Sequence, residues 1–247
     1  MGLCTRILAS ETDIVIKTFT GSEPYEDLFT ELKYLHRVQG VTGVQKLVGV
    51  ALKLPLLITE FDGISLYKYC CKDIEKNKFF IILKNICRTV KELNMLGIIH
   101  NDIKSDNICV KESHGEPKTS LIDFGNSTEK GDILFKRRLS KHAKETLDWI
   151  APEVQESKVS TPESDAYSVA VMTEELTKNL NMSLPREMQN WIKKCQEKNP
   201  AKRPDMDDLI NIIDSKQRKR SRTEYDTEEE QQQQPPQKRT KSYCTLI

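Results

Sequence analysis

The stretch from residue 100 to residue 125 constrains the fold of this chain most, because polar side chains stand there between short apolar runs. It reads HNDIKSDNICV at residues 100–110 and LIDFG at residues 121–125. Short β-branched runs bounded by turn residues are typical of strands. We therefore expect strands at 96–99 and 120–122 that flank a loop, with its polar side chains at the rim of a buried scaffold.

Four side chains of this stretch suit phosphoryl transfer from a metal-bound nucleotide: Asp102, Lys104, Asn107 and Asp123. Such a reaction needs a carboxylate to orient the attacking hydroxyl, a cation to offset charge on the moving phosphoryl group, and two oxygen ligands for Mg²⁺. The alternative is that Asp102 and Asn107 are ordinary loop residues that bond to their own backbone. That alternative leaves the further motifs below unexplained.

Two motifs of the stretch resemble the catalytic loop and the metal-binding turn of eukaryotic protein kinases, whose patterns are H-R-D-L-x-x-x-N and D-F-G. One departure is Asn101, which stands where the family has arginine. The resemblance implies an α+β, bilobal fold with a small antiparallel β-sheet lobe and a larger, mainly α-helical lobe. It also implies two catalytic residues, Asp102 and Lys104, and two Mg²⁺ ligands, Asn107 and Asp123.

The resemblance covers residues 2–214 and divides the chain into three parts. An abbreviated N-terminal lobe with the start of the hinge is expected at 1–62, a helical C-terminal lobe at 63–214, and a tail at 215–247. A chain of 247 residues with 37% hydrophobic residues can form one such two-lobed domain. The net charge of +1 implies no bulk attraction to nucleic acid or membranes, and no apolar run approaches the ~20 residues of a membrane span.

A β-hairpin is expected near the N-terminus, with strands at 6–10 and 14–19. Lys17 lies in the second strand within Val-Ile-Lys. This resembles the V-A-I-K strand of the family, whose lysine pairs with the nucleotide phosphates and with a helix glutamate. Taken alone, Lys17 would more simply bury its stem and keep its ammonium group in water. Its place before the other motifs favours the nucleotide-binding role.

Residues 24–38 have the apolar periodicity of a helix, and Ser22 is the expected N-cap. Glu31 on this helix resembles the glutamate that pairs with the family's lysine. Glu26 is a weaker rival for that role, and a solvated surface charge is the alternative for Glu31.

Two strands, at 44–50 and 54–59, are expected to lead into a segment that resembles the kinase hinge. In that family, backbone groups of the hinge hydrogen-bond the adenine edge. By position Thr59 would be the gatekeeper residue, and Glu60 and Phe61 would begin the hinge. These three residues are therefore candidates for ATP binding.

The Gly-rich loop of the family, G-x-G-x-x-G-x-V, is largely missing from the sequence. Only Gly2 to Cys4 align with it, near its end, so its first strand and first two glycines have no counterpart. Because backbone N–H groups of that loop cover the nucleotide phosphates, we expect weak ATP binding.

The C-terminal lobe is expected to contain helices at 63–69 and 76–95, the second with a buried apolar stripe. Residues 123–153 resemble a kinase activation segment and end in the family's A-P-E motif. A basic run at 136–138 could contact an acidic substrate, or it could form a solvated loop.

Three further positions resemble structural residues of the family. Asp165 resembles the aspartate of a core helix that caps the backbone of the catalytic loop. Glu153 of the A-P-E motif and Arg203 resemble a family pair, so we expect a buried ion pair between them. Such a pair preserves geometry more than it adds net stability.

The tail has almost no apolar residues and is expected to be disordered. Its basic clusters at 216–222 and 238–241 fit a nuclear import signal, an anionic surface or simple solubilising charge. The last four residues form an imperfect prenylation box at Cys244. The seven cysteines include no C-x-x-C pair, which favours an intracellular protein, in the nucleus or cytoplasm. Membrane association is expected only through a prenylated Cys244.

The sequence thus predicts a monomeric enzyme that uses ATP and Mg²⁺ to phosphorylate serine and threonine hydroxyls of protein substrates, with no specific nucleic-acid partner. Lys104, two residues after Asp102, resembles serine/threonine kinases more than tyrosine kinases. One alternative is a pseudokinase that binds partners as a scaffold without transfer. Another is a small-molecule kinase of the same fold, although such kinases usually lack the A-P-E motif. The compact size also resembles kinases carried by large DNA viruses.

Overall fold

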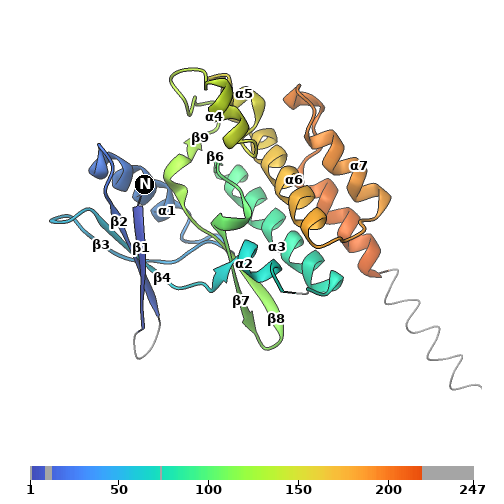
Figure 1. Cartoon of the computed structure of the whole chain (residues 1–247), viewed down its shortest axis with the longest axis horizontal. Helices are drawn as coiled ribbons and strands as arrows, with labels where there is room; N and C mark the ends of the chain where they lie inside the picture. The colour runs from blue at the N-terminus through green and yellow to red at the C-terminus, as the bar shows by residue number, and fades with distance from the viewer. Residues whose placement is uncertain (1, 9–12, 73, 219–247) are drawn as a thin grey trace, which may run out of the picture.

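The computed structural model describes residues 2–8, 13–72 and 74–218, and the chain forms two lobes (Figure 1). The smaller lobe carries a four-stranded antiparallel sheet and one helix, and the larger lobe is mainly helical. The α+β, bilobal fold predicted from the sequence is therefore confirmed. No helix among the described residues is both long and apolar enough to cross a membrane. Residues 11 and 12 of the predicted hairpin turn and the predicted tail beyond residue 218 lie outside the described residues.

The sheet of the small lobe has the strand order β1-β2-β4-β3. Its strands are β1 (Gly2–Ile7), β2 (Ile14–Phe19), β3 (Leu47–Ala51) and β4 (Leu56–Glu60). The first strand begins earlier than predicted because the pairing of the hairpin extends to Gly2 opposite Phe19. In β2, Lys17 lies between Cys4 of β1 and Leu57 of β4, which fixes the backbone of the lysine within the sheet.

Helix α1 (Pro24–Arg37) packs on this sheet and buries Leu28, Glu31, Tyr34 and Leu35. The helix begins at Pro24 because proline has the right φ for a first turn and needs no N–H there. The N-cap is therefore Glu23, which makes no side-chain capping bond. The prediction of Ser22 as N-cap is wrong, since its hydroxyl lies one residue too early to accept from the first turn.

The chain enters the large lobe through an extended segment where a helix is predicted from residue 63. Gly63 has a φ of +104°, and a Cβ there would lie 2.1 Å from the carbonyl oxygen of Val110. This close approach requires glycine and an extended backbone, so the prediction is corrected to a short strand followed by a helix. The elements are β5 (Ile64–Ser65) and α2 (Leu66–Cys70), with β5 in a sheet with β7 (Ile108–Ser113) and β8 (Glu116–Leu121).

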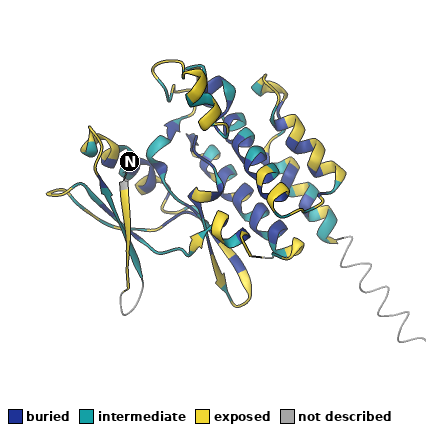
Figure 2. Ribbon diagram, viewed as in Figure 1, coloured by how far each residue is buried: buried dark blue, intermediate teal, exposed yellow. Residues whose placement is uncertain are grey.

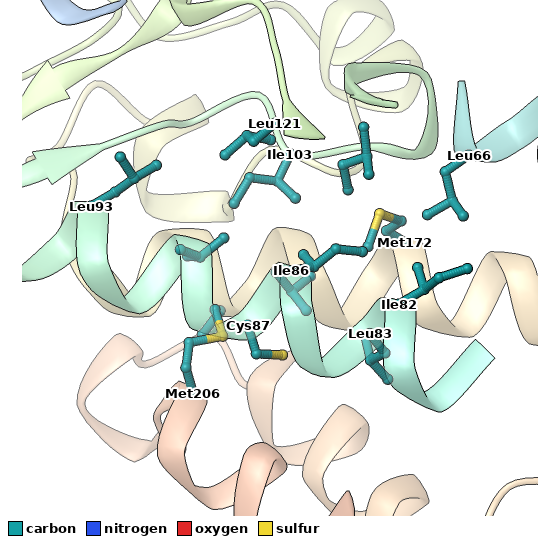
Figure 3. Packing of buried hydrophobic residues seen from close by; sticks show 14 of the residues in the cluster. Leu66, Ile82, Leu83, Ile86, Cys87, Leu93, Ile103, Leu121, Met172 and Met206 are labelled. Atoms are coloured by element: carbon teal, nitrogen blue, oxygen red, sulfur yellow. The ribbon is translucent and has the colours of Figure 1, made fainter. Parts of the chain in front are cut away.

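Helix α3 (Lys76–Met95) has the predicted bounds and forms the centre of the large lobe. Its apolar stripe faces α6 (Pro162–Asn179), where Ile82 and Ile86 lie beside Met172 (Figure 3). Burying a side chain of this size stabilises the fold by about 1.5–3 kcal/mol. Figure 2 shows buried residues concentrated along α3 and α6, while the outer face of α7 (Arg186–Cys195) is exposed.

The last described helix runs over residues 206–218, past the boundary expected at 214. Lys216 forms an ion pair of 2.8 Å with Glu187 of α7, and the hydroxyl of Ser215 donates to the carbonyl oxygen of Ile212. The helix therefore extends past the boundary predicted at 214, because residues 215–218 continue it and Lys216 contacts α7.

Two very short strands frame the polar loop, β6 (Ile98–Ile99) and β9 (Thr128–Glu129). The predicted strand at 96–99 is shortened because Gly97, at φ +76°, turns the chain out of α3. Asp123 lies two residues after the end of β8 and has a φ of +64°. The remaining elements are short helices: η1 (Ser105–Asn107), η2 (Phe124–Asn126), α4 (Lys141–Thr146), α5 (Pro152–Gln155) and η3 (Pro200–Lys202).

Candidate active site

A cleft of about 630 Å³ lies between the two lobes. The small lobe contributes its sheet and α1, and the large lobe contributes the polar loop and the segment after β8. Predicted site residues from both lobes line the cleft: Lys17, Glu31, Thr59, Phe61, Asp102, Lys104 and Asp123. The fold thus brings most of the predicted residues to one place.

Lys17 joins the two lobes at the back of the cleft. Its Nζ lies 2.6 Å from Glu31 Oε2 on α1 and 2.9 Å from Asp123 Oδ1 in the large lobe. Burial opposes the charged form of Lys17, but the two carboxylates outweigh it and raise the pKa of Lys17 to about 12. The ammonium group is therefore charged and oriented toward the segment that follows β8.

The two carboxylates that hold Lys17 differ in their titration. Burial raises the pKa of Glu31 to about 7, against the attraction of the Lys17 ammonium. Asp123 is more open to the cleft, with 39% of its side chain exposed. Although burial also acts against its charge, the Lys17 ammonium holds the pKa of Asp123 below its ordinary value. Asp123 is therefore ionised at neutral pH, whereas Glu31 titrates near it.

The hinge residues are only partly arranged as expected. Thr59 is buried and lines the cleft, and the ring of Phe61 stacks against the Arg6 guanidinium, 3.7 Å from its centroid. The backbone N–H groups of Glu60 and Phe61 already donate within the small lobe, to Lys46 and Asp13. The Glu60 carboxylate lies 3.5 Å from Lys46 Nζ, and Glu60 is absent from the cleft lining. These two N–H groups are therefore not free to recognise an adenine edge.

Asp62 is a cleft residue that the sequence reasoning missed. Its Oδ2 is buried without a hydrogen-bond partner among the described residues, and burial raises the pKa of its carboxyl group. An orphan acceptor of this kind is costly unless a ligand or water satisfies it. The only sequence signal for it is an acidic residue two positions after a strand.

The polar loop is held from below by Asp165 of α6. The backbone N–H groups of His100 and Asn101 each donate to Asp165 over 3.0 Å, and Asn94 donates to the same carboxylate. Asn101 has a φ of +62°, a left-handed conformation that asparagine tolerates better than most residues. Asp165 thus stabilises a backbone conformation that sets the direction of Asp102.

Asp102 is buried, and its carboxylate receives donors from three side chains. Lys104 Nζ lies 3.2 Å from both oxygens, and Asn107 Nδ2 lies 2.8 Å from Oδ2. The indole Nε1 of Trp149 donates to Oδ1 over 2.7 Å. Trp149 is the second residue that the sequence reasoning missed, because it is one of the unspecified positions before the A-P-E motif at the end of the activation segment.

The end of the activation segment is anchored by the predicted pair of Glu153 and Arg203. Both guanidinium NH groups of Arg203 bind the two oxygens of Glu153 at 2.8 Å, and the Arg203 side chain is fully buried. Ser164 Oγ adds a third donor to Glu153 at 2.8 Å. A fork-to-fork pair of this kind fixes geometry as well as charge.

The residues that could hold a cation are Asn107 and Asp123. Both side-chain hydrogen bonds that Asn107 makes within the described residues use its amide nitrogen, so its carbonyl oxygen is left for a cation. Across the described parts of the chain, no three His, Cys, Asp or Glu side chains gather as a metal cluster. Two oxygen ligands are the kind of set that binds Mg²⁺ together with substrate phosphates, so the pair fits a magnesium nucleotide.

Comparisons with known proteins give the same family as the site motifs. The family model for the protein kinase domain matches residues 10–183. The serine/threonine/tyrosine-protein kinase HT1 of Arabidopsis thaliana is 29% identical over 154 residues, which is 53% of this chain and 38% of that protein. The putative serine/threonine-protein kinase/receptor R826 of Acanthamoeba polyphaga mimivirus is 24% identical over 213 residues, 74% of this chain and 12% of that protein. Although the chain thus spans less than half the length of these relatives, the family match covers most of it, and the chain belongs to the protein kinase family.

Proposed function

We propose that this protein transfers the γ-phosphoryl group of ATP, bound with Mg²⁺, to serine and threonine hydroxyls of proteins. The observation that carries the proposal is that two preorganised sets of side chains line the same cleft. One is the Asp102 carboxylate with Lys104, and the other is the Lys17 ammonium held between Glu31 and Asp123. Asn107 is absent from the cleft lining but donates to the Asp102 carboxylate.

Each residue has a distinct task in this proposal. Asp102 orients the acceptor hydroxyl and takes its proton, and Lys104 offsets negative charge on the phosphoryl group that moves. Lys17 binds the nucleotide phosphates, and Asn107 and Asp123 would hold Mg²⁺, which supplies further charge compensation at the phosphates when bound. Because the Asp102 carboxylate and the Lys17 ammonium are held in place before the reaction, little reorganisation of these two groups is needed when charge develops.

The choice of serine and threonine hydroxyls rests on Lys104. It stands two residues after Asp102, the spacing that resembles serine/threonine kinases, and its Nζ bridges both oxygens of Asp102. Several curated relatives are named as serine/threonine-protein kinases, which supports the same acceptor. The basic run at residues 136–138 is exposed, so an acidic protein belongs among the acceptors to be tried.

The test is transfer of labelled phosphate from Mg-ATP to one basic and one acidic generic protein, followed by identification of the labelled amino acid. Wild type is compared with Asp102→Asn, Asp123→Asn and Lys17→Met, each of which should remove transfer while far-UV circular dichroism stays unchanged. Asp106→Asn, an exposed neighbour in the same loop, is the matched control and should retain the wild-type rate.

The competing function is a scaffold that binds partners without transfer. It requires that purified wild type show no more labelled product than Asp102→Asn on every acceptor, with and without Mg²⁺. Labelled tyrosine in place of serine or threonine would instead keep the transferase and contradict the assignment of the hydroxyl.

A further inference from the structure

Trp149 makes the shortest of the hydrogen bonds that Asp102 receives. Its indole N–H donates to Oδ1 over 2.7 Å, while Lys104 Nζ lies 3.2 Å from Oδ1 and Oδ2. The same Lys104 Nζ lies 4.4 Å from the centroid of the Trp149 ring, a cation–π distance. One aromatic side chain therefore contacts both residues that would handle the acceptor hydroxyl. We propose that Trp149 is a positioning residue for transfer, which fixes the Asp102 carboxylate through its N–H and the Lys104 ammonium through its ring.

The hydrogen bonds of Asp102 explain why such a residue is needed. A carboxylate has about four lone-pair sites, and here Trp149, Asn107 and the two contacts of Lys104 fill them. When Lys104 turns to the phosphoryl group, as the proposed function requires, it vacates a site on each oxygen. Asn107 then holds Oδ2 and Trp149 holds Oδ1, so the carboxylate keeps its plane while one vacated site receives the hydroxyl.

Trp149 is itself held in place by α6. Its carbonyl oxygen accepts a hydrogen bond of 2.7 Å from Ser168 Oγ. Ser168 lies three residues after Asp165, so the two side chains share one face of the helix. Asp165 fixes the backbone that leads into Asp102, and Ser168 fixes the residue that contacts its carboxylate. The nearby hydroxyl of Thr146 does not compete, because it donates to the carbonyl oxygen of His142.

The inference rests on the proposed function, and its central test is Trp149→Phe. Phenylalanine keeps an aromatic ring next to Lys104 but removes the N–H donor. Loss of one charge-assisted hydrogen bond should lower kcat about 10- to 100-fold. The KM for ATP should stay within about twofold, because Lys17 and Asp123 are untouched. Trp149→Leu, which also removes the ring, should lower kcat further.

The second tryptophan provides a matched control. Trp191 is buried, and its Nε1 donates to the carbonyl oxygen of Asp205 over 2.9 Å, outside the cleft. Trp191→Phe removes an indole hydrogen bond in the same way and should leave kcat unchanged. Binding of a non-hydrolysable Mg-ATP analogue shows that each variant is folded before its kcat is compared.

A readout independent of transfer uses the Trp191→Phe background, in which Trp149 is the only tryptophan of the chain. Asp102→Ala should change the intensity or wavelength of its fluorescence, and Asp106→Ala should not. Wild-type kcat in Trp149→Phe, or a kcat above wild type in either Trp149 variant, would overturn the positioning role. An inactive wild type would instead overturn the proposed function. If Asp102→Ala leaves the fluorescence of Trp149 unchanged, the contact between Trp149 and Asp102 is contradicted.

Discussion

Asn101 and Thr128 are joined by a hydrogen bond of 3.0 Å from Nδ2 to Oγ1. Asn101 Nδ2 also donates to the carbonyl oxygen of Asn126 at 3.1 Å, so a neutral amide connects the catalytic loop to the start of the activation segment. One residue further, Glu129 forms ion pairs with Lys33 and Arg37 of α1. The start of the segment is thus held by a neutral amide and by ion pairs between side chains of the chain itself.

We predict from these contacts that transfer does not depend on phosphorylation of the activation segment. An arginine before the catalytic aspartate could clamp a phosphate bidentately, whereas the buried amide of Asn101 cannot. Phosphatase treatment should therefore leave the rate unchanged, and Ser140→Ala combined with Thr146→Ala should do the same. A large fall in rate after phosphatase treatment, reversed by rephosphorylation, would contradict the prediction.

Protonation of Glu31 should lower the transfer rate on the acid side of neutral pH, which gives the pH–rate profile an acid limb. Its pKa is raised to about 7 by burial, and only the ionised form pairs with Lys17. As the pH falls through about 7, Glu31 gains a proton, the pair weakens, and kcat/KM for ATP should fall. A pH–rate profile from 5.5 to 8.5 measures this, and Glu31→Gln should lower the plateau and remove the limb.

The raised pKa of Glu31 should affect the stability of the fold in the opposite direction from its effect on activity. A carboxyl group whose folded-state pKa lies above its unfolded value stabilises the fold most at low pH. That contribution should be fully present below about 4.5 and be lost as the pH rises through about 7. Glu31→Gln should therefore flatten this part of the stability profile, and an unchanged slope would contradict the assignment.

The pair of Glu153 and Arg203 should matter for stability far more than exposed pairs do. Arg203→Ala leaves the Glu153 carboxylate buried without its partner, which should cost about 3–5 kcal/mol in the free energy of unfolding. Lys216→Ala removes half of a more exposed pair with Glu187 and should cost less than about 1 kcal/mol. Urea unfolding of the two variants measures the difference, and equal losses would contradict the argument.

We propose that the tail sets location and not catalysis. Truncation after Arg218, where the described helix ends, should preserve the transfer rate. Neutralising Arg218, Lys219 and Arg220 in a tagged protein should reduce its nuclear signal, because these residues lie in the denser basic cluster. Movement of Cys244→Ser from the membrane fraction to the soluble fraction would contradict nuclear import as the role of the tail and indicate prenylation instead.

The sequence predicted those helices and strands that are determined by residues close together in the chain. The bounds of α3 follow from an apolar stripe that repeats over twenty residues, and the lysine strand β2 follows from β-branched residues. Gly63 was misassigned because its conformation is set by the carbonyl group of Val110, which is distant in sequence. The boundary predicted at 214 falls inside a helix for the same reason, since Lys216 of that helix pairs with Glu187, which is distant in sequence.

In the candidate site, too, the residues of local motifs could be predicted, whereas those defined by distant contacts could not. Residues that stand in ordered motifs, such as Asp102 and Asp123, could be named from the sequence and are found in one cleft. Trp149 could not, because its partner lies 47 residues away and no motif assigns it a hydrogen bond. Asp62 was missed because an orphan acceptor is defined by its burial, which the sequence does not reveal.

Asp165 and Ser168 stand three residues apart on α6, and together they place the acceptor-binding groups on the large lobe, apart from the nucleotide-binding groups of the small lobe. Asp102, which would meet the acceptor hydroxyl, and Trp149, which would position it, are both tied to this one helix of the large lobe. Lys17 and Glu31 belong to the small lobe. A rotation of one lobe against the other would therefore change the grip on the nucleotide and leave the acceptor geometry intact. Substitutions between the lobes should accordingly alter nucleotide exchange without changing which proteins are accepted.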